Sequence, residues 1–426
     1  MEKTDERKDF LKTFIWNSLG TGINSFNSLF FLIIVTRING TETAGIFSLG
    51  YATACILYTL AMYSGRLCQV TDVEGKIKDK DYIVTRLFTC FLMCLGAGVF
   101  LAIKRYSLFK TSVFVLLALY RGIEAFADVL YGVMQKNGFL YKCGKSLTAK
   151  GIIGVVLFGV IDYFTKNIDL ACLSIIVINL IILFIYDYLI VSKDLIEKPK
   201  FLVENVVSIL KNEFFVFANS FAGIYILNAP KYAIDGFLTE SEQAIYGYIM
   251  MPATVMTLFT QFIVMPFLGK MKDMYEAKKL DDITKTTFKI KIVVILFAGF
   301  AVLAAFLLGP EVLGILYGLD LTAYRMNLCV IIASYVFYAL SYVDLVTLTT
   351  IRHTFVQFVI YMISMVVAFV GSNLLVRTFS LGINGATFSC TTTLAVQYIL
   401  YFIVTNIIMR KVKKEFKDLN AKEIEA

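Results

Sequence analysis

The sequence of 426 residues lacks several features that define other classes of protein. It holds five prolines, one tryptophan and one histidine, His353, and its eight cysteines show no paired metal-ligand spacing. A lone histidine is a poor candidate for a metal site or proton relay, so we expect no bound metal. A Gly-rich phosphate loop of the Walker type is also missing, which argues against nucleotide-driven chemistry. No connection between apolar segments exceeds roughly 20 residues, which is too short for a separate soluble domain.

Apolar residues make up most of the chain. They account for 58% of it, aromatic residues for 15%, and the mean hydropathy is +0.75. Runs of about 20 apolar residues, the length that crosses the hydrocarbon core of a bilayer, recur along the sequence. We therefore predict an all-α polytopic membrane protein with twelve transmembrane helices. The predicted spans are 10–36, 44–63, 83–103, 107–134, 147–164, 170–191, 214–234, 244–268, 290–308, 326–348, 354–376 and 383–409.

The twelve spans form two halves of six, which predicts two lobes. The predicted N-terminal lobe covers residues 1–195, a cytoplasmic linker 196–213, the C-terminal lobe 214–410 and a cytoplasmic tail 411–426. Both halves begin on the same side of the membrane, so any internal repeat is of the parallel kind. The sequence FADVL in span four, around Asp128, is echoed by YVDLV in span ten, around Asp344. Agreement of position within each half supports a repeat.

Basic residues predict the orientation. With the N-terminus inside, 31 of the 40 Lys and Arg fall in inner segments and eight in outer ones. Basic loops are retained in the cytoplasm, so both termini are expected there, and Cys143 is expected to react with thiol reagents only from that side. The first apolar run has no cleavage site and is expected to remain a span. Lys150, Asp187 and Asp344 lie near inner helix ends, where we expect them to be solvated.

Three ionisable residues interrupt the otherwise apolar fourth span. Arg121, Glu124 and Asp128 are spaced three and four apart, so they share one helix face. A charge at this depth costs about 2.5 to 3.5 kcal/mol, and it usually faces a bundle interior or a wet cavity. One hypothesis is a cavity face on a transport path, and the other is a self-neutralised network between helices. The triad carries a net charge of minus one.

Two other spans contain candidate site residues. Asn17, Thr21, Asn24 and Ser28 form a polar stripe on span one, which suits sugar hydroxyls but also the hydrogen bonds that join membrane helices. Of these, Asn17, Thr21 and Asn24 are the candidates for substrate binding. Span seven has Pro230 beside Lys231. A proline frees a backbone carbonyl and favours a kink, so Pro230 is a candidate hinge. Lys231 is a candidate for substrate binding, or else its amine extends to the membrane surface.

Several segments spread over nearly the whole chain carry a resemblance to a known family. The segments are RGIEAFADVLYG from Arg121, Gln135-Lys136, NAPKY from Asn228, AIYGY from Ala244, Gln261, MPF from Met265, and GPEVLGILYG from Gly309, which we place in a short outer segment. Together they resemble the bacterial polysaccharide flippases, which transport lipid-linked O-antigen or capsule repeat units. These flippases belong to the superfamily of multidrug, oligosaccharide-lipid and polysaccharide exporters.

The resemblance implies a fold and a function. It implies two six-helix lobes around a central cavity, with helices one and seven bent, in a bacterial cytoplasmic membrane. Alternating access then carries an undecaprenyl-diphosphate-linked oligosaccharide from the inner to the outer leaflet. Arg121 is the candidate for the phosphate, because Arg binds phosphate bidentately. A carboxylate of span four is the candidate for a coupling proton or sodium ion, with no other cofactor expected.

Two alternatives stay open. A cation-coupled drug or metabolite exporter of the same superfamily predicts a cavity dominated by acidic residues. A membrane enzyme such as a polysaccharide polymerase needs a large outer loop, and none is present, so we expect no enzyme. A polymerase and glycosyltransferases are instead expected partners. Nucleic acid is not, because the basic residues are spread over seven inner segments.

Overall fold

The computed structural model describes residues 2–63, 65–71, 77–194 and 203–425, with side chains for 11–63, 65–66, 68–71, 77–192 and 203–416. The described residues form helices and no strands. The chain divides into two compact units, Met1–Ile224 and Tyr225–Ala426. The helices up to the division, which falls inside α9, are α1 (Glu2–Met62), α2 (Gly65–Thr71), α3 (Asp79–Lys104), α4 (Leu108–Lys136), α5 (Leu140–Thr165), α6 (Ile168–Ile182), the π-helix η1 (Leu183–Tyr188), α7 (Leu189–Asp194), α8 (Val203–Asn212) and α9 (Phe214–Ile234).

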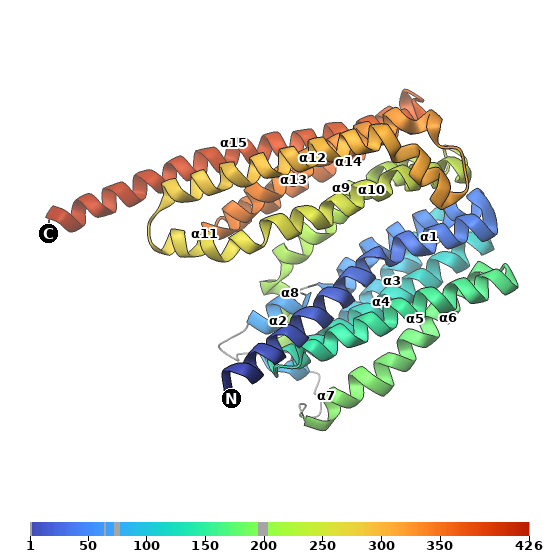
Figure 1. Cartoon of the computed structure of the whole chain (residues 1–426), viewed down its shortest axis with the longest axis horizontal. Coiled ribbons are helices and arrows are strands. Elements are labelled where there is room, and N and C mark those ends of the chain that lie inside the picture. The colour runs from blue at the N-terminus through green and yellow to red at the C-terminus, as the bar shows by residue number, and fades with distance from the viewer. Residues whose placement is uncertain (1, 64, 72–76, 195–202, 426) are drawn as a thin grey trace. The chain divides into compact units, whose positions relative to one another are not determined.

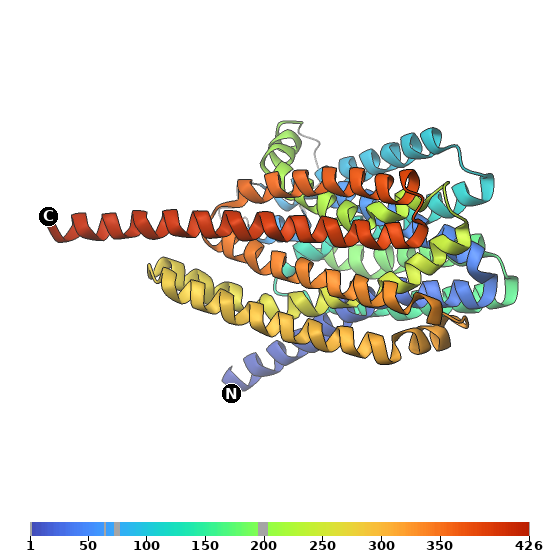
Figure 2. The same cartoon turned by 90° about the horizontal axis from the view of Figure 1, so that it is seen from above.

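The second unit is also entirely helical over its described residues. Its last helix, α15, extends far beyond the helices beside it (Figure 2). The 3-10 helix η2 and the π-helix η3 are short elements next to α13 and α14. The elements after α9 are α10 (Glu240–Val264), α11 (Pro266–Glu276), α12 (Leu280–Tyr317), η2 (Thr322–Tyr324), α13 (Arg325–Thr350), α14 (Thr354–Asn373), η3 (Leu374–Thr378) and α15 (Gly382–Glu425).

The helices account for the twelve predicted spans. Among the described residues, nine helical stretches are long and apolar enough to cross a membrane. One of them, α1, supplies two spans, and α4 and α9 supply the remaining two. Those two are less apolar because α4 carries Arg121, Glu124 and Asp128, and α9 carries Asn228 and Lys231. The predicted fold class, twelve transmembrane helices in two halves, is confirmed.

Spans one and two form one helical stretch with a sharp kink. The stretch from Glu2 to Met62 stays helical except at Gly40, where φ is 84° and ψ is 178°. Glycine has no Cβ and adopts this positive φ without strain, so one residue reverses the chain direction where the sequence suggested a longer loop. α1 therefore runs along the first unit and turns back on itself (Figure 1). Its two halves pack against α3, α4 and α5.

Close approach between α1 and α5 depends on small residues. A Cβ built on Gly144 of α5 would lie 2.4 Å from the backbone of Trp16, and one on Gly20 of α1 would lie 2.5 Å from the carbonyl oxygen of Gly144. Such distances exclude any side chain at either position. Without a hydrophobic force between helices in lipid, close backbone packing of this kind is a main source of association. It fixes the polar stripe of α1 against α5.

Two expectations differ from the structure at particular residues, and a third lies partly outside the described residues. Gly309 and Pro310 lie inside α12, which continues to Tyr317, so the predicted short outer segment is the end of that helix. Cys143 is wholly buried among the side chains of α4 and α5, so it cannot report orientation by its reactivity, because a reagent cannot reach it from either side. The predicted linker contains helix α8 at 203–212, and its residues 196–202 lie outside the described residues.

Candidate functional site

The charged residues of α4 lie on one face, as the spacing predicts, but they do not form a triad. Arg121 Nη1 lies 2.5 Å from Glu124 Oε2. The hydroxyl of Tyr120 donates to the other carboxylate oxygen, Glu124 Oε1, at 2.9 Å. Arg121 and Glu124 are therefore a close pair, and Asp128 belongs to a different set of contacts.

Aromatic residues of α1 hold the Arg121 guanidinium. Its Cζ lies 4.7 Å from the ring centroid of Tyr58 and 5.2 Å from that of Tyr51. Its Nη2 donates to Cys55 Sγ at 3.2 Å. A guanidinium over aromatic faces gains cation–π attraction, which is larger when the group is desolvated. Arg121 thus has protein partners on several sides.

Asp128 faces two arginines that come from other helices. Its Oδ2 lies 3.7 Å from Arg86 Nη2, and its Oδ1 lies 3.9 Å from Arg66 Nε. Arg86 is in α3, where it also donates to the carbonyl oxygen of Ala61 at 3.3 Å. Arg66 is in α2, which begins at Gly65 with a positive φ of 66° and packs against α4. In the sequence, both arginines count only among the inner basic residues that predict the orientation, and their contact with Asp128 was not predicted.

A cavity of about 180 Å³ lies beside these charges, inside the first unit. Arg66 lines it with a side chain that is 28% exposed. The Nη1 atom of Arg66 is buried and has no hydrogen-bond partner among the described residues. Arg121 does not line the cavity. The lining residues are Thr21, Asn24, Ser25 and Tyr58 from α1, Arg66 from α2, Glu124, Ala127, Asp128 and Tyr131 from α4, and Leu147 and Lys150 from α5.

The wall of the cavity formed by α5 contains a buried ion pair. Lys150 Nζ lies 2.6 Å from Asp187 Oδ2 and donates to the Tyr131 hydroxyl at 3.0 Å. The Tyr131 and Ser146 hydroxyls are 2.8 Å apart. Asp187 is fully buried on the π-helix η1, a type of distortion that is frequent at functional sites. The expectation that Lys150 and Asp187 are solvated is wrong, because each satisfies the charge of the other inside the bundle.

The added arginines reverse the charge of the site. Arg66, Arg86 and Arg121 face Glu124 and Asp128, which leaves a net charge of plus one, and the pair from α5 and η1 is neutral. The triad alone is negative and suits an anion poorly. The complete cluster suits one, and its surplus arginine, Arg66, is the one that reaches the cavity with an unpaired donor.

The polar stripe of α1 reaches the cavity in part. Thr21 and Asn24 line it, together with Ser25, whose hydroxyl donates to the carbonyl oxygen of Thr21 at 2.8 Å. Asn17 lies two helical turns before Asn24 and outside the lining. The side-chain oxygen of Asn17 is buried without a hydrogen-bond partner in the part of the chain that the structure describes. The structure thus brings Thr21 and Asn24, two of the four predicted stripe residues, to the lining of the cavity, and Ser28 is outside it.

Pro230 and Lys231 lie near the end of α9, in the second unit. Pro230 is inside the helix, which continues to Ile234. Lys231 is only 7% exposed, so its amine does not extend to the protein surface. Arg377 of η3 binds the end of α9: its Nε donates to the carbonyl oxygen of Ala233 at 2.8 Å, and its Nη2 to that of Asp235 at 2.9 Å. Arg377 therefore fixes the helix end that follows the candidate hinge.

The second unit contains a counterpart of the Arg86–Asp128 contact. Lys291 of α12 lies 2.7 Å from Asp344 of α13, so in each unit a base on the third span faces an acid on the fourth. The arrangement supports the internal repeat inferred from the echoed sequences. Asp344 is buried, so the expectation of a solvated carboxylate is wrong here too. No group of three or more His, Cys, Asp or Glu within the described residues is arranged to hold a metal ion.

Solved structures share this fold. The inward-facing conformation of a multidrug resistance MATE family transporter of the MOP superfamily matches with a TM-score of 0.72 and 12% identity, over 93% of this chain and 98% of that one. A MOP superfamily transporter from Pyrococcus furiosus, described as having a binding pocket of reverse polarity, matches with a TM-score of 0.58 and 13% identity, over 95% and 96%. The fold is that of membrane transporters of the MOP superfamily.

The sequence is also similar to a bacterial protein of polysaccharide synthesis. It is 24% identical over 412 residues to the capsular polysaccharide biosynthesis protein CapF of Staphylococcus aureus, which covers 92% of this chain and 98% of that one. No family model matches the chain. The comparisons confirm the predicted resemblance to polysaccharide flippases of the MOP superfamily. The chain is a multi-pass membrane protein, and the solved structures that share its fold are of transporters.

Proposed function

We propose that this protein flips an undecaprenyl-diphosphate-linked oligosaccharide from the inner to the outer leaflet by alternating access. The observation that carries the proposal is a cavity beside a cluster of three arginines and two carboxylates, where Arg66 has a buried donor without a partner among the described residues. A diphosphate needs positive charge and hydrogen-bond donors that lipid cannot supply. The similarity to a protein of capsular polysaccharide biosynthesis supports a glycan substrate.

The cavity residues divide into two proposed roles. Arg66 binds phosphate in the planar, bidentate way that Arg favours, and Arg86 keeps the charge of Asp128 balanced while it does so. Thr21 and Asn24 accept and donate hydrogen bonds to the sugar. The predicted contributions of Asn17 and Lys231 to binding, and of Pro230 as a hinge, stay part of the proposal.

Arg121 has a different proposed role from the one its sequence suggests. It lies outside the lining of the cavity and is held by Glu124 and by the tyrosines of α1. We propose that it positions Glu124, which does line the cavity. Direct binding of phosphate by Arg121 is the alternative, and the two roles predict different behaviour when the pair is removed together.

We propose that an ion drives the cycle. Asp128 Oδ2 and Asp187 Oδ1 are buried carboxylate oxygens that lack a hydrogen-bond partner among the described residues. Such an oxygen can take up a proton, or it can ligate sodium, which prefers oxygen ligands as other hard cations do. Glycosyltransferases that build the substrate and a polymerase that uses it are the proposed partners.

A drug exporter is the second candidate, because the matching structures include multidrug transporters. An exporter of organic cations needs a cavity with surplus negative charge, since like charges repel strongly where water is excluded. Here the charged lining residues have no surplus negative charge, because Arg66 and Lys150 balance Glu124 and Asp128. Arg86 and Arg121 add positive charge beside these carboxylates. The charge balance therefore favours the lipid-linked glycan.

Transport by the purified protein in liposomes tests the proposal. We expect a fluorescent lipid-linked oligosaccharide to become accessible to a membrane-impermeant quencher faster than in empty liposomes, and an imposed proton or sodium gradient to change the rate. Accumulation of an organic cation dye under the same gradients, without glycan flipping, would establish the drug exporter instead. Free lipid without the glycan serves as the control for unspecific scrambling.

The orientation is a separate prediction. Lys272→Cys places a thiol on an exposed position of α11, and Thr165→Cys places one at the far end of α5. In a background with Cys94→Ser, an impermeant thiol reagent should label only Thr165→Cys in intact cells and both after permeabilisation. Burial and a hydrogen bond to Glu213 raise the pKa of the native Cys68 thiol to about 12, so Cys68 stays protonated and unreactive. The reverse labelling pattern would place the termini outside.

A further inference from the structure

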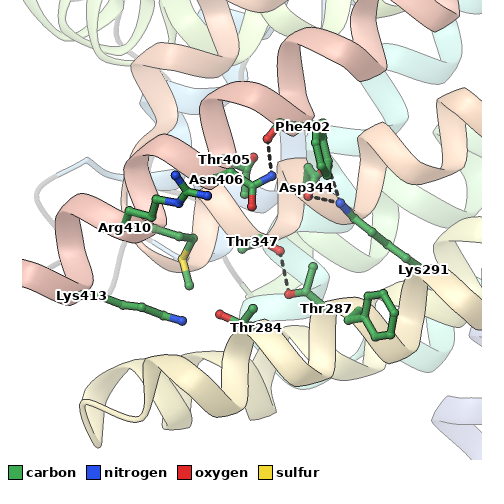
Figure 3. Close-up of a pocket in the computed structure, with 12 residues that line it drawn as sticks. Thr284, Thr287, Lys291, Asp344, Thr347, Phe402, Thr405, Asn406, Arg410 and Lys413 are labelled. Carbon is green, nitrogen blue, oxygen red and sulfur yellow. Dashed lines mark hydrogen bonds and ion pairs between the residues drawn. The ribbon is translucent and has the colours of Figure 1, made fainter.

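The second unit has its own cavity, of about 320 Å³, between α12, α13 and α15. It lies near the helix ends that carry the basic residues of the unit (Figure 3). The Lys291–Asp344 pair lies on one side of it, and the Thr287 and Thr347 hydroxyls, 3.2 Å apart, close another side. None of the residues proposed above for transport lines this cavity.

The charge of the cavity is positive. Three cationic side chains, Lys291, Arg410 and Lys413, line it against one acid, Asp344. Arg410 makes no hydrogen bond or ion pair with any described residue. Lys413 pairs with Asp281 at 2.8 Å, but the Asp281 side chain is 84% exposed, and such surface pairs contribute little. Two cations are thus available to a ligand.

A buried hydroxyl also lacks a partner at this cavity. Thr405 lines it and is 5% exposed, and its Oγ1 has no hydrogen bond within the described residues. Thr347, on the opposite helix, instead satisfies its hydroxyl with the carbonyl oxygen of Val343 at 2.9 Å. A buried hydroxyl without a partner is costly, and a ligand oxygen would satisfy it.

Apolar side chains border the same cavity. Phe288 and Phe402 line it and are both exposed on the surface of the unit, where a membrane helix meets acyl chains. The site thus combines donors and positive charge with an adjoining apolar surface. A phosphate ester attached to hydrocarbon chains has this same combination.

We propose that this cavity binds the phosphate headgroup of an anionic phospholipid, taken from the leaflet at the basic ends of α12 and α15. Arg410 and Lys413 contact the phosphate oxygens, and Thr405 donates to one of them. The acyl chains lie along Phe288 and Phe402. A lipid bound here links α12, α13 and α15, so it stabilises the second unit whatever substrate the protein transports. Juxtamembrane basic residues attract anionic lipid generally. The cavity in addition gives the lipid headgroup a defined binding position.

Thermal unfolding of the purified full-length protein in detergent tests the site. Dioctanoyl phosphatidylglycerol should raise the Tm, and dioctanoyl phosphatidylcholine, with the same chains and no net charge, should raise it much less. In the variant Arg410→Gln with Lys413→Gln, the concentration of phosphatidylglycerol needed for half the shift should increase by about tenfold or more. Both positions should accept glutamine without strain, because the Arg410 side chain is exposed and the Lys413 side chain is 31% exposed.

A matched control removes two charges from the same helix. Lys411→Gln with Lys414→Gln changes positions that do not line the cavity, so it should keep the response of the native protein. Equal loss in both variants would overturn the proposal in favour of general surface attraction, and no preference for the anionic lipid in the native protein would overturn it outright. Inorganic phosphate that stabilises as well as the lipid would show a site for the free ion and overturn the lipid as the ligand.

Discussion

Arg66→Ala is expected to abolish glycan flipping while the protein remains at its normal level in the membrane. Arg66 lines the cavity of the first unit, and its Nη1 has no hydrogen-bond partner among the described residues. Its removal leaves Asp128 with Arg86 at 3.7 Å, so the buried carboxylate keeps a counter-charge. Charge-assisted hydrogen bonds to a phosphate contribute about 1.5 to 3 kcal/mol each, and a bidentate contact has two of them. Losing both bonds is therefore expected to slow transport by roughly a hundredfold or more.

Two further variants make this result specific. Arg66→Lys should recover part of the rate, because lysine keeps the charge but lacks the planar fork. Lys142→Ala removes a basic residue of the same unit that does not line the cavity, and it should transport normally. The liposome assay and the amount of protein in the membrane are the two measurements. Normal flipping by the Arg66→Ala variant would show that this cavity does not bind the phosphate of the substrate.

The fold follows from the sequence to a large extent because its signals are local. A run of about 20 apolar residues has one stable form in a bilayer, since a helix satisfies its own backbone hydrogen bonds. The spans and their number were therefore predictable. The kink at Gly40 was not located, because any glycine permits a positive φ and the sequence does not indicate which one adopts it.

The candidate site was predictable only where its residues share a helix. The spacing of Arg121 and Glu124 predicts their pairing directly. The partners of Asp128 come from α2 and α3, and pairing between helices depends on rotation and depth, which a linear pattern does not contain. Arg86 had one usable signal, its position one turn inside the start of span three. A basic residue at this position is equally well explained as an orientation signal. The position of Arg86 therefore did not indicate its contact with Asp128.

The same limit applies to the buried pair of α5 and η1. Lys150 and Asp187 are 37 positions apart, and each lies near a predicted helix end where solvent is the usual partner. The π-helix from Leu183 to Tyr188 changes which face of the sixth span Asp187 occupies. One extra residue in a turn rotates every later side chain, so a regular helical pattern misplaces it. Its burial therefore appears only in the folded unit.

Arg121→Ala is expected to lower the amount of protein in the membrane several-fold. The reason is that Glu124, whose side chain is 12% exposed, loses its ion partner at 2.5 Å, and breaking a buried pair from one side costs about 3 to 5 kcal/mol. Glu124→Gln with Arg121→Ala removes both charges and should restore the amount of protein, which quantitative immunoblotting measures. Flipping by that double variant then separates the two roles. Recovery of transport shows that Arg121 positions Glu124, whereas an abundant but inactive double variant shows that Arg121 itself binds the phosphate.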